Sequence, residues 1–281
     1  RRPSGVPIAN VRKVGILGAG MMGAGIALVA ARAGIEVVLL DTSIEAAQKG
    51  KAYSEKVLAK QVASGKCSQS EGETTHGLIQ PSADYDALAD VGLVIEAVFE
   101  DTLLKADVTR RAGQIIGEDT IFASNTSTLP ISRLADAFPR PDDFIGLHFF
   151  SPVDRMALVE VIRGERTSDR TLARALDFVA QLRKTPIVVN DRRGFYTSRV
   201  FQTFIHEGME LLREGVTAAL IENAAKIAGM PVGPLAVLDE VSLDLPMKIV
   251  RQSEAEDAAY RRPANPRLLF PSRPPLPDFS H

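Results

Sequence analysis

The pattern that most constrains this chain is a G-x-G-x-x-G run at residues 18–23, directly after a short apolar stretch. That stretch, residues 14–17, is too short for a helix and ends at a glycine, which indicates a buried parallel strand. The spacing then predicts a helix over residues 21–32 and a second strand over residues 36–40. Strand, glycine turn, helix and strand in this order are typical of one βαβ unit of a doubly wound sheet.

Each position of the run has a separate physical role. Gly18 permits a tight turn, Gly20 lets the backbone approach a pyrophosphate, and Gly23 lets the helix pack closely on the strand. The free N–H groups of the helix N-terminus attract the same phosphate. Asp41 ends the second strand about 20 residues later, where a carboxylate accepts from a ribose diol and repels a 2′-phosphate. An ordinary glycine-rich turn is the alternative, but the flanking elements favour an NAD site.

The remaining pattern alternates strands with helices up to about residue 190, which predicts a mostly parallel sheet. From residue 195 the chain reads as all helical. We therefore expect a Rossmann-type α/β domain followed by a smaller all-α domain. The expected divisions are a linker (1–11), an NAD-binding domain (12–191), an incomplete helical substrate or dimerisation domain (192–252) and a disordered proline-rich tail (253–281). Within the first domain, we expect residues 67–77 to form a loop or a frayed helix turn.

Two strands near residue 150 break the parallel pattern. Only a short turn joins GLHFF to LVEVI, so this pair should be antiparallel. If the connection folds symmetrically about Asp154, facing residues have numbers that sum to 308, and His148 then faces Glu160. Either residue alone fits a structural role. Together they indicate an oriented general base, with the histidine taking a proton and the glutamate orienting it.

The composition of the chain argues against nucleic acids and membranes as partners. The net charge of −2 does not indicate a basic surface for nucleic acid, and no apolar run is long enough to cross a bilayer. The single cysteine, Cys67, has no metal-ligand spacing, which suggests an inert thiol and a cytoplasmic location, and we expect no metal. Lys49, Lys56 and Lys60 share one face of the predicted helix 44–64. That face is either solvated or a contact for a polyphosphorylated substrate.

The chain resembles the 3-hydroxyacyl-CoA dehydrogenase family, in the version found within multifunctional fatty-acid oxidation enzymes. GAGMMGAGIA, VIEAVFE, IFASNTSTLPI, GLHFFSPVDRMALVEVI and GFYTSRVF carry the resemblance, from about residue 12 to about residue 250. It implies His148, Glu160 and Ser124 as catalytic residues. The implied cofactor contacts are Gly18, Gly20, Met22, Gly23, Asp41, Val98, Phe99, Glu100, Lys105, Ser124 and Ser151. The expected substrate contacts are Ser124, Asn125, Ser198, Lys49 and Lys56. Ser151 and Ser198 stand where relatives often have asparagine.

The resemblance implies NAD-dependent oxidation of (3S)-3-hydroxyacyl-CoA to 3-oxoacyl-CoA in fatty-acid β-oxidation. It also implies an acyl-CoA substrate and a chain that is a homo-oligomer or part of a larger multifunctional enzyme. One alternative is a non-catalytic or truncated NAD-binding scaffold of the same fold, which the fold alone does not exclude. Another is a dehydrogenase for a small hydroxy acid, which would leave the lysine-bearing helix unexplained.

Overall fold

The computed structural model describes residues 1–241. The expected tail, residues 253–281, lies outside the described residues, as does the end of the helical domain expected over residues 192–252. The chain divides into two compact units, Arg1–Tyr196 and a second unit that begins at Thr197. Each unit is described by itself. No helix within the described part of the chain is long and apolar enough to span a membrane.

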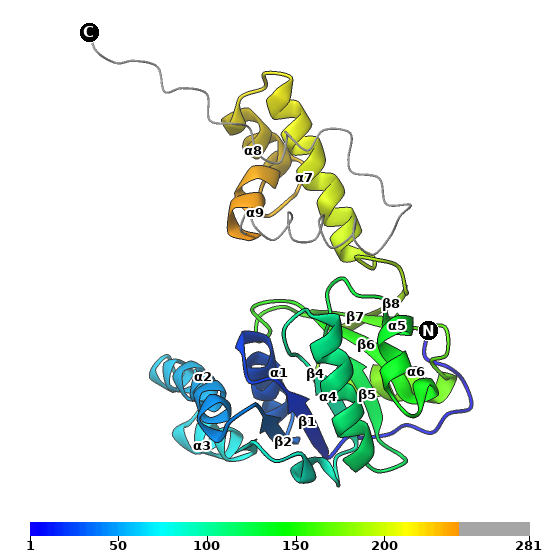
Figure 1. Ribbon diagram of the computed structural model, residues 1–281. Coiled ribbons are helices and arrows are strands. Elements are labelled where there is room, and N and C mark those ends of the chain that lie inside the picture. The colour runs from blue at the N-terminus through cyan, green and yellow to red at the C-terminus, as the bar shows by residue number, and fades with distance from the viewer. Residues whose placement is uncertain (242–281) are drawn as a thin grey trace. The chain divides into compact units, whose positions relative to one another are not determined.

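The first unit is built on an eight-stranded sheet with the strand order β3-β2-β1-β4-β5-β6-β7-β8 (Figure 1). Neighbouring strands are parallel except β6 and β7. The antiparallel pairing of β6 with β7 is the one predicted from the sequence, and because β8 is parallel to β7, both final strands run against the rest. The strands are β1 (Lys13–Leu17), β2 (Glu36–Leu40), β3 (Ile79–Ser82), β4 (Leu93–Glu96), β5 (Ile121–Ser124), β6 (Phe144–Phe149), β7 (Leu158–Arg163) and β8 (Thr185–Asn190).

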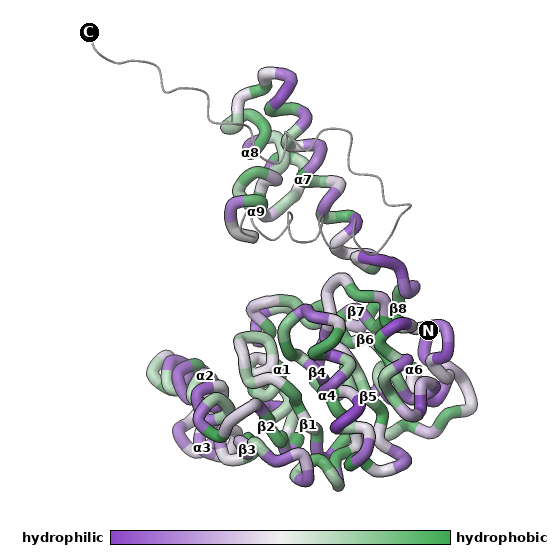
Figure 2. Tube along the Cα trace, in the orientation of Figure 1, coloured by the Kyte–Doolittle hydropathy of each residue, from purple (hydrophilic) through white to green (hydrophobic). Residues whose placement is uncertain are grey.

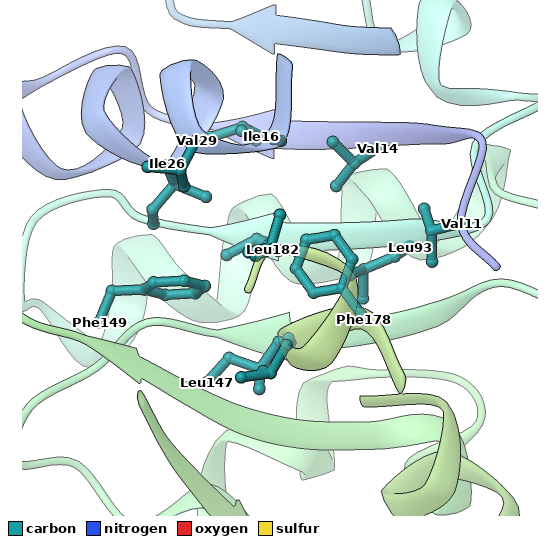
Figure 3. Packing of buried hydrophobic residues seen from close by; sticks show 14 of the residues in the cluster. Val11, Val14, Ile16, Ile26, Val29, Leu93, Leu147, Phe149, Phe178 and Leu182 are labelled. Carbon is teal, nitrogen blue, oxygen red and sulfur yellow. The ribbon is translucent and has the colours of Figure 1, made fainter. Parts of the chain in front are cut away.

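Helices cover both faces of this sheet. On one face, residues of α1 and α6 pack with alternate strand residues in a core that includes Ile26, Phe178 and Leu147 (Figure 3). On the other face, α4 and α5 cover a core that contains the stacked rings of Phe122 and Phe144. The helices of this unit are α1 (Met21–Arg32), α2 (Ile44–Ala63), α3 (Gln69–Gly77), α4 (Thr102–Ile115), α5 (Ile131–Leu134) and α6 (Asp169–Gln181), with 3₁₀ turns η1 (Tyr85–Leu88), η2 (Ala135–Ala137) and η3 (Pro141–Asp143).

Strand residues alternate between the two faces, which decides where polar side chains gather. Val94 and Phe122 belong to the core under α4, so Glu96 and Ser124, two residues further along the same strands, face that side as well. His148 lies four residues after Phe144 and faces the same way. The carboxyl ends of β4, β5 and β6 therefore present polar side chains on one face of the sheet.

Two local predictions need correction. Residues 67–77 are expected as a loop or a frayed turn, but most of them form α3. Ser68 caps this helix by accepting from Glu71 N, while the Glu71 carboxylate accepts from Ser68 N, a capping box. The N-terminal segment, expected as a linker, is bound to α6: Arg2 donates to both carboxylate oxygens of Asp177 at 2.6 and 2.9 Å.

The second unit contains three described helices, α7 (Thr197–Arg213), α8 (Ala218–Ile227) and α9 (Pro234–Val241). Ile205, Met209 and Leu238 form its small core. Gly229, with φ of +96°, follows α8 in the left-handed conformation that commonly ends helices and that glycine adopts readily. Apolar and polar stretches alternate along α7 (Figure 2), in keeping with an amphipathic helix.

Candidate functional site

The glycine turn between β1 and α1 has the geometry of a phosphate cradle. Gly18 has a φ of +95° and donates its N–H to Leu40 O at 2.8 Å. A Cβ at Gly23 would collide with the carbonyl oxygen of Gly18, so only glycine lets the helix lie this close. A Cβ at Gly20 would meet nothing within 4 Å, which leaves the backbone open to a ligand. The residues present therefore fit a dinucleotide pyrophosphate at the N-terminus of α1.

Asp41 follows β2 and lies beside this turn. Its Oδ2 accepts from Ala19 N at 2.6 Å, and its Oδ1 accepts from Thr42 N at 2.7 Å. These contacts hold a half-buried carboxylate next to the glycine run. Each oxygen of an ionised carboxylate can accept more than one hydrogen bond, so both remain able to bind a ribose diol.

His148 and Glu160 face each other in the antiparallel pair β6–β7, in the register predicted from the sequence. Their side chains meet, with His148 Nδ1 2.7 Å from Glu160 Oε2. Glu160 is fully buried and His148 is 7% exposed. Glu160 Oε1 also accepts from Tyr196 N at 3.0 Å. The preceding Phe195 has a φ of +47° and buries its ring near the imidazole. The turn at residues 194–196 therefore fixes the carboxylate that orients the imidazole.

Ser124 lies at the end of β5, the strand next to β6, and is fully buried. Its Oγ donates to Glu96 Oε2 at 2.7 Å. Lys105 on α4 is also buried, and its Nζ lies 2.8 Å from Glu96 Oε1, 3.3 Å from Val98 O and 3.2 Å from Glu100 Oε2. These three acceptors match the three N–H donors of the ammonium. The ammonium group of Lys105 thus holds the carboxylates of both glutamates, Glu96 and Glu100, in place.

Glu100 joins the loop after β4 to the loop after β5. Its Oε1 accepts from Thr126 Oγ1 at 2.6 Å, Ser127 N at 2.9 Å and Thr128 N at 3.1 Å. Burial is the largest single effect on the pKa of Glu100 and raises it, but the attraction of Lys105 and these hydrogen bonds together outweigh it. The pKa therefore lies below its ordinary value. The ionised carboxylate of Glu100 therefore links two loops at the carboxyl edge of the sheet.

Asn125 is half-exposed beside the imidazole-bearing strand. Its Oδ1 accepts from Phe149 N at 2.8 Å, which extends the contact between β5 and β6 and leaves the amide N–H groups to other partners. Phe99 is 86% exposed at the same edge, and Ser151, also exposed, donates to Met21 Sδ at 3.8 Å. Met22 and Val98 are half-buried.

The remaining predicted contacts lie elsewhere. Lys49 and Lys56 are exposed on α2, and no described contact joins them to the groups above. Ser198 is half-buried in the first turn of α7, in the second unit. Among residues 1–241, no three or more histidine, cysteine or acidic side chains are grouped as metal ligands would be.

The sequence analysis assigns no role to Glu96 or to the backbone N–H of Tyr196. A signal for Glu96 was present, since it is a carboxylate that ends an apolar run, at the strand edge where ligands bind. Nothing local marks the Tyr196 amide, because its partner Glu160 lies 36 residues away.

Two family models match almost the whole chain. The model described as 3-hydroxyacyl-CoA dehydrogenase, NAD binding domain, covers residues 13–192. The model of the same family's C-terminal domain covers residues 194–273, so the similarity extends beyond the limit of about residue 250 given by the sequence analysis.

Individual relatives agree with these models. The fatty acid oxidation complex subunit alpha of Shewanella baltica is 42% identical over 241 residues, or 85% of this chain. The chain spans about a third of that relative's length, 34%. Among solved structures, an (S)-3-hydroxybutyryl-CoA dehydrogenase from Ralstonia eutropha is 39% identical with a TM-score of 0.83, covering 88% of this chain and 89% of its own. A 3-hydroxybutyryl-CoA dehydrogenase from Escherichia coli K12 is 33% identical with a TM-score of 0.83, covering 86% of this chain and 52% of its own.

Proposed function

The chain belongs to the 3-hydroxyacyl-CoA dehydrogenase family and carries its NAD-binding domain, and we propose that it oxidises (3S)-3-hydroxyacyl-CoA to 3-oxoacyl-CoA. The observation that carries this proposal is the buried contact of 2.7 Å between His148 and Glu160. A histidine held by a carboxylate at the edge of a dinucleotide-binding sheet is suited to remove a hydroxyl proton. NAD, when bound, supplies the hydride acceptor.

In the proposed reaction the two ring nitrogens of His148 have separate tasks. Nδ1 donates to Glu160 Oε2, which fixes the tautomer and leaves Nε2 as the basic nitrogen. Nε2 then takes the proton of the 3-hydroxyl, and the Glu160 carboxylate stabilises the imidazolium that forms. Glu160 stays oriented because its other oxygen is held by Tyr196 N. Ser124 and Asn125, at the end of the adjacent strand, are the proposed contacts of the substrate oxygen.

The wider setting of the reaction is also part of the proposal. The Shewanella relative is named as a subunit of a fatty acid oxidation complex and is much longer, which supports a role in fatty-acid β-oxidation within a larger multifunctional chain. We propose a cytoplasmic location and a homo-oligomer if the chain acts alone. Lys49 and Lys56, exposed on α2, are the proposed contacts of the CoA phosphates, and Ser198 is proposed to contact the substrate.

A stereochemical assay tests the reaction. The purified chain is mixed with NAD and either (3S)- or (3R)-3-hydroxybutyryl-CoA, and NADH formation is followed by absorbance. We expect turnover with the (3S) compound and little with the (3R) compound. A chain that binds NAD but forms no NADH with the (3S) compound or its longer homologues would favour the non-catalytic scaffold.

A further inference from the structure

Glu96 is a buried carboxylate that joins several of the groups described above. It ends β4, is 1% exposed, and lies in register with Ser124 of β5. Its Oε2 accepts from Ser124 Oγ at 2.7 Å, and its Oε1 accepts from Val98 N and Lys105 Nζ, each at 2.8 Å. One side chain thus fixes groups from β5, from α4 and from the loop after β4, at the edge where ligands of such sheets bind.

Stability is a weak explanation for this arrangement. The side chains of Lys105 and Glu96 are 2% and 1% exposed, and removing two charges from water costs about as much as their attraction returns. Well-packed apolar residues would hold β4, β5 and α4 together at least as well. What the carboxylate provides, and an apolar side chain cannot, is a defined direction for the Ser124 hydroxyl.

Resting on the function proposed above, we propose that Glu96 is a positioning residue that makes Ser124 a hydrogen-bond acceptor toward a bound hydroxyl group. A serine hydroxyl carries one hydrogen, and an ionised carboxylate only accepts. Because the Ser124 hydrogen is donated to Glu96, Ser124 presents lone pairs alone to a ligand. The 3-hydroxyl of the substrate also carries one hydrogen, which in the proposed reaction is directed to His148 Nε2. The hydroxyl group that donates to Ser124 is therefore a ribose hydroxyl of NAD.

The burial of Ser124 makes the direction of its hydrogen bond important for ligand affinity. Ser124 is fully buried, so a ligand hydroxyl contacts it only when neighbouring side chains move aside, and the ligand group then leaves water behind. A polar group left unpaired in such a place loses its hydration without replacement, a penalty that lowers affinity by about tenfold or more. A ligand group that cannot donate a hydrogen bond to Ser124 is therefore strongly disfavoured.

The variant Glu96→Gln should invert the polarity. Val98 N–H and the Lys105 ammonium both require an acceptor, so the single oxygen of the glutamine would face them. Its NH₂ group would then face Ser124. The Ser124 hydroxyl would accept from the glutamine and turn its own hydrogen toward the ligand.

The experiment measures dissociation constants for the full chain and the Glu96→Gln variant. The probes are NAD, by fluorescence titration, and (3S)-3-hydroxybutyryl-CoA and acetoacetyl-CoA, by calorimetry. In Glu96→Gln the dissociation constant for NAD should rise about tenfold. The ratio of the dissociation constants for (3S)-3-hydroxybutyryl-CoA and acetoacetyl-CoA should stay within about twofold. An NAD dissociation constant that changes by less than about twofold in a folded variant would overturn the proposal.

Three further variants make the test specific. In a Ser124→Ala background, Glu96→Gln should have no further effect on either quantity, and a persisting effect would show that Glu96 does not act through Ser124. Thr120→Val is the matched control, because Thr120 donates a buried hydroxyl to Val91 O at 2.6 Å just before the same strand. Thr120→Val should lower the melting temperature and leave the dissociation constants unchanged. If Glu96→Gln does not fold, Glu96→Gln with Lys105→Met removes both buried charges and is measured instead.

Failure of this inference is distinguishable from failure of the proposed function. Absence of turnover by the unaltered chain argues against the function. Normal turnover by the unaltered chain, with unchanged affinities in the folded Glu96→Gln variant, argues against the role of Glu96 alone.

Discussion

The imidazole of His148 and the carboxylate of Glu160 meet at 2.7 Å across an antiparallel pair of strands, β6 and β7, with the glutamate fully buried. A buried carboxylate of this kind needs partners for both oxygens. His148 Nδ1 meets one oxygen, and the N–H of Tyr196 meets the other. The pair is therefore held from the sheet on one side and from the turn after β8 on the other.

Replacing His148 by alanine should lower kcat by about 10²- to 10⁴-fold, the usual contribution of a general base. NAD affinity should stay within about twofold, because the imidazole is proposed to contact the reacting hydroxyl and not the dinucleotide. Steady-state assays and fluorescence titration measure the two quantities. His76→Ala on α3, distant from these strands, is the control, and a near-normal kcat in His148→Ala would contradict the mechanism.

Replacing Asp41 by asparagine should narrow the preference for NAD over NADP. The carboxylate lies beside the glycine turn, where it accepts from Ala19 N at 2.6 Å, and its charge would repel a 2′-phosphate. The ratio of kcat/KM for the two cofactors measures the effect. Equal affinity of the unaltered chain for NAD and NADP would refute this role of Asp41.

Two glycine-to-alanine substitutions should separate folding from binding. In Gly23→Ala the new Cβ collides with Gly18 O, so the melting temperature should fall. In Gly20→Ala the Cβ meets nothing within 4 Å, so the melting temperature should hold while NAD affinity falls by about tenfold or more. Thermal unfolding with and without NAD measures both effects. Unchanged NAD affinity in Gly20→Ala would place the pyrophosphate elsewhere.

Glu100 should contribute stability that is lost in acid. Its folded-state pKa is depressed below the ordinary value of 4.5, so the ionised form favours folding above that pH, and the contribution fades as the pH falls through the folded pKa. Because a third of the side chain is exposed, we expect Glu100→Gln to cost only about 1 kcal/mol at pH 6.

Urea unfolding at several pH values tests this. The difference in the free energy of unfolding between the unaltered chain and Glu100→Gln should shrink below about pH 4. Asp107→Asn, which removes an exposed acid from the same region, is the control. A difference that stays constant between pH 6 and pH 3 would show that the charge of Glu100 is not the source of its effect.

Local sequence patterns were enough to predict the βαβ unit that is proposed to bind the cofactor. The glycine run, the helix Met21–Arg32 and the strand Glu36–Leu40 lie in one continuous stretch, so residue order alone fixes their spacing. The pairing of His148 with Glu160 was also predictable, because a connection that folds symmetrically about Asp154 places these two residues opposite each other, as the structure has them. The capping box of α3 is equally local, although the polar composition of residues 67–77 is more typical of a loop.

The environment of Ser124 was decided by the tertiary structure alone. Glu96 and Ser124 are 28 residues apart on parallel strands joined through a helix, and such a crossover does not fix which residues become partners. The burial of Lys105 depends on how α4 packs on those strands, and the contact of Tyr196 N with Glu160 depends on the turn after β8. Sequence periodicity identifies the residues of each element, whereas side-chain packing between elements distant in the sequence decides which polar atoms meet.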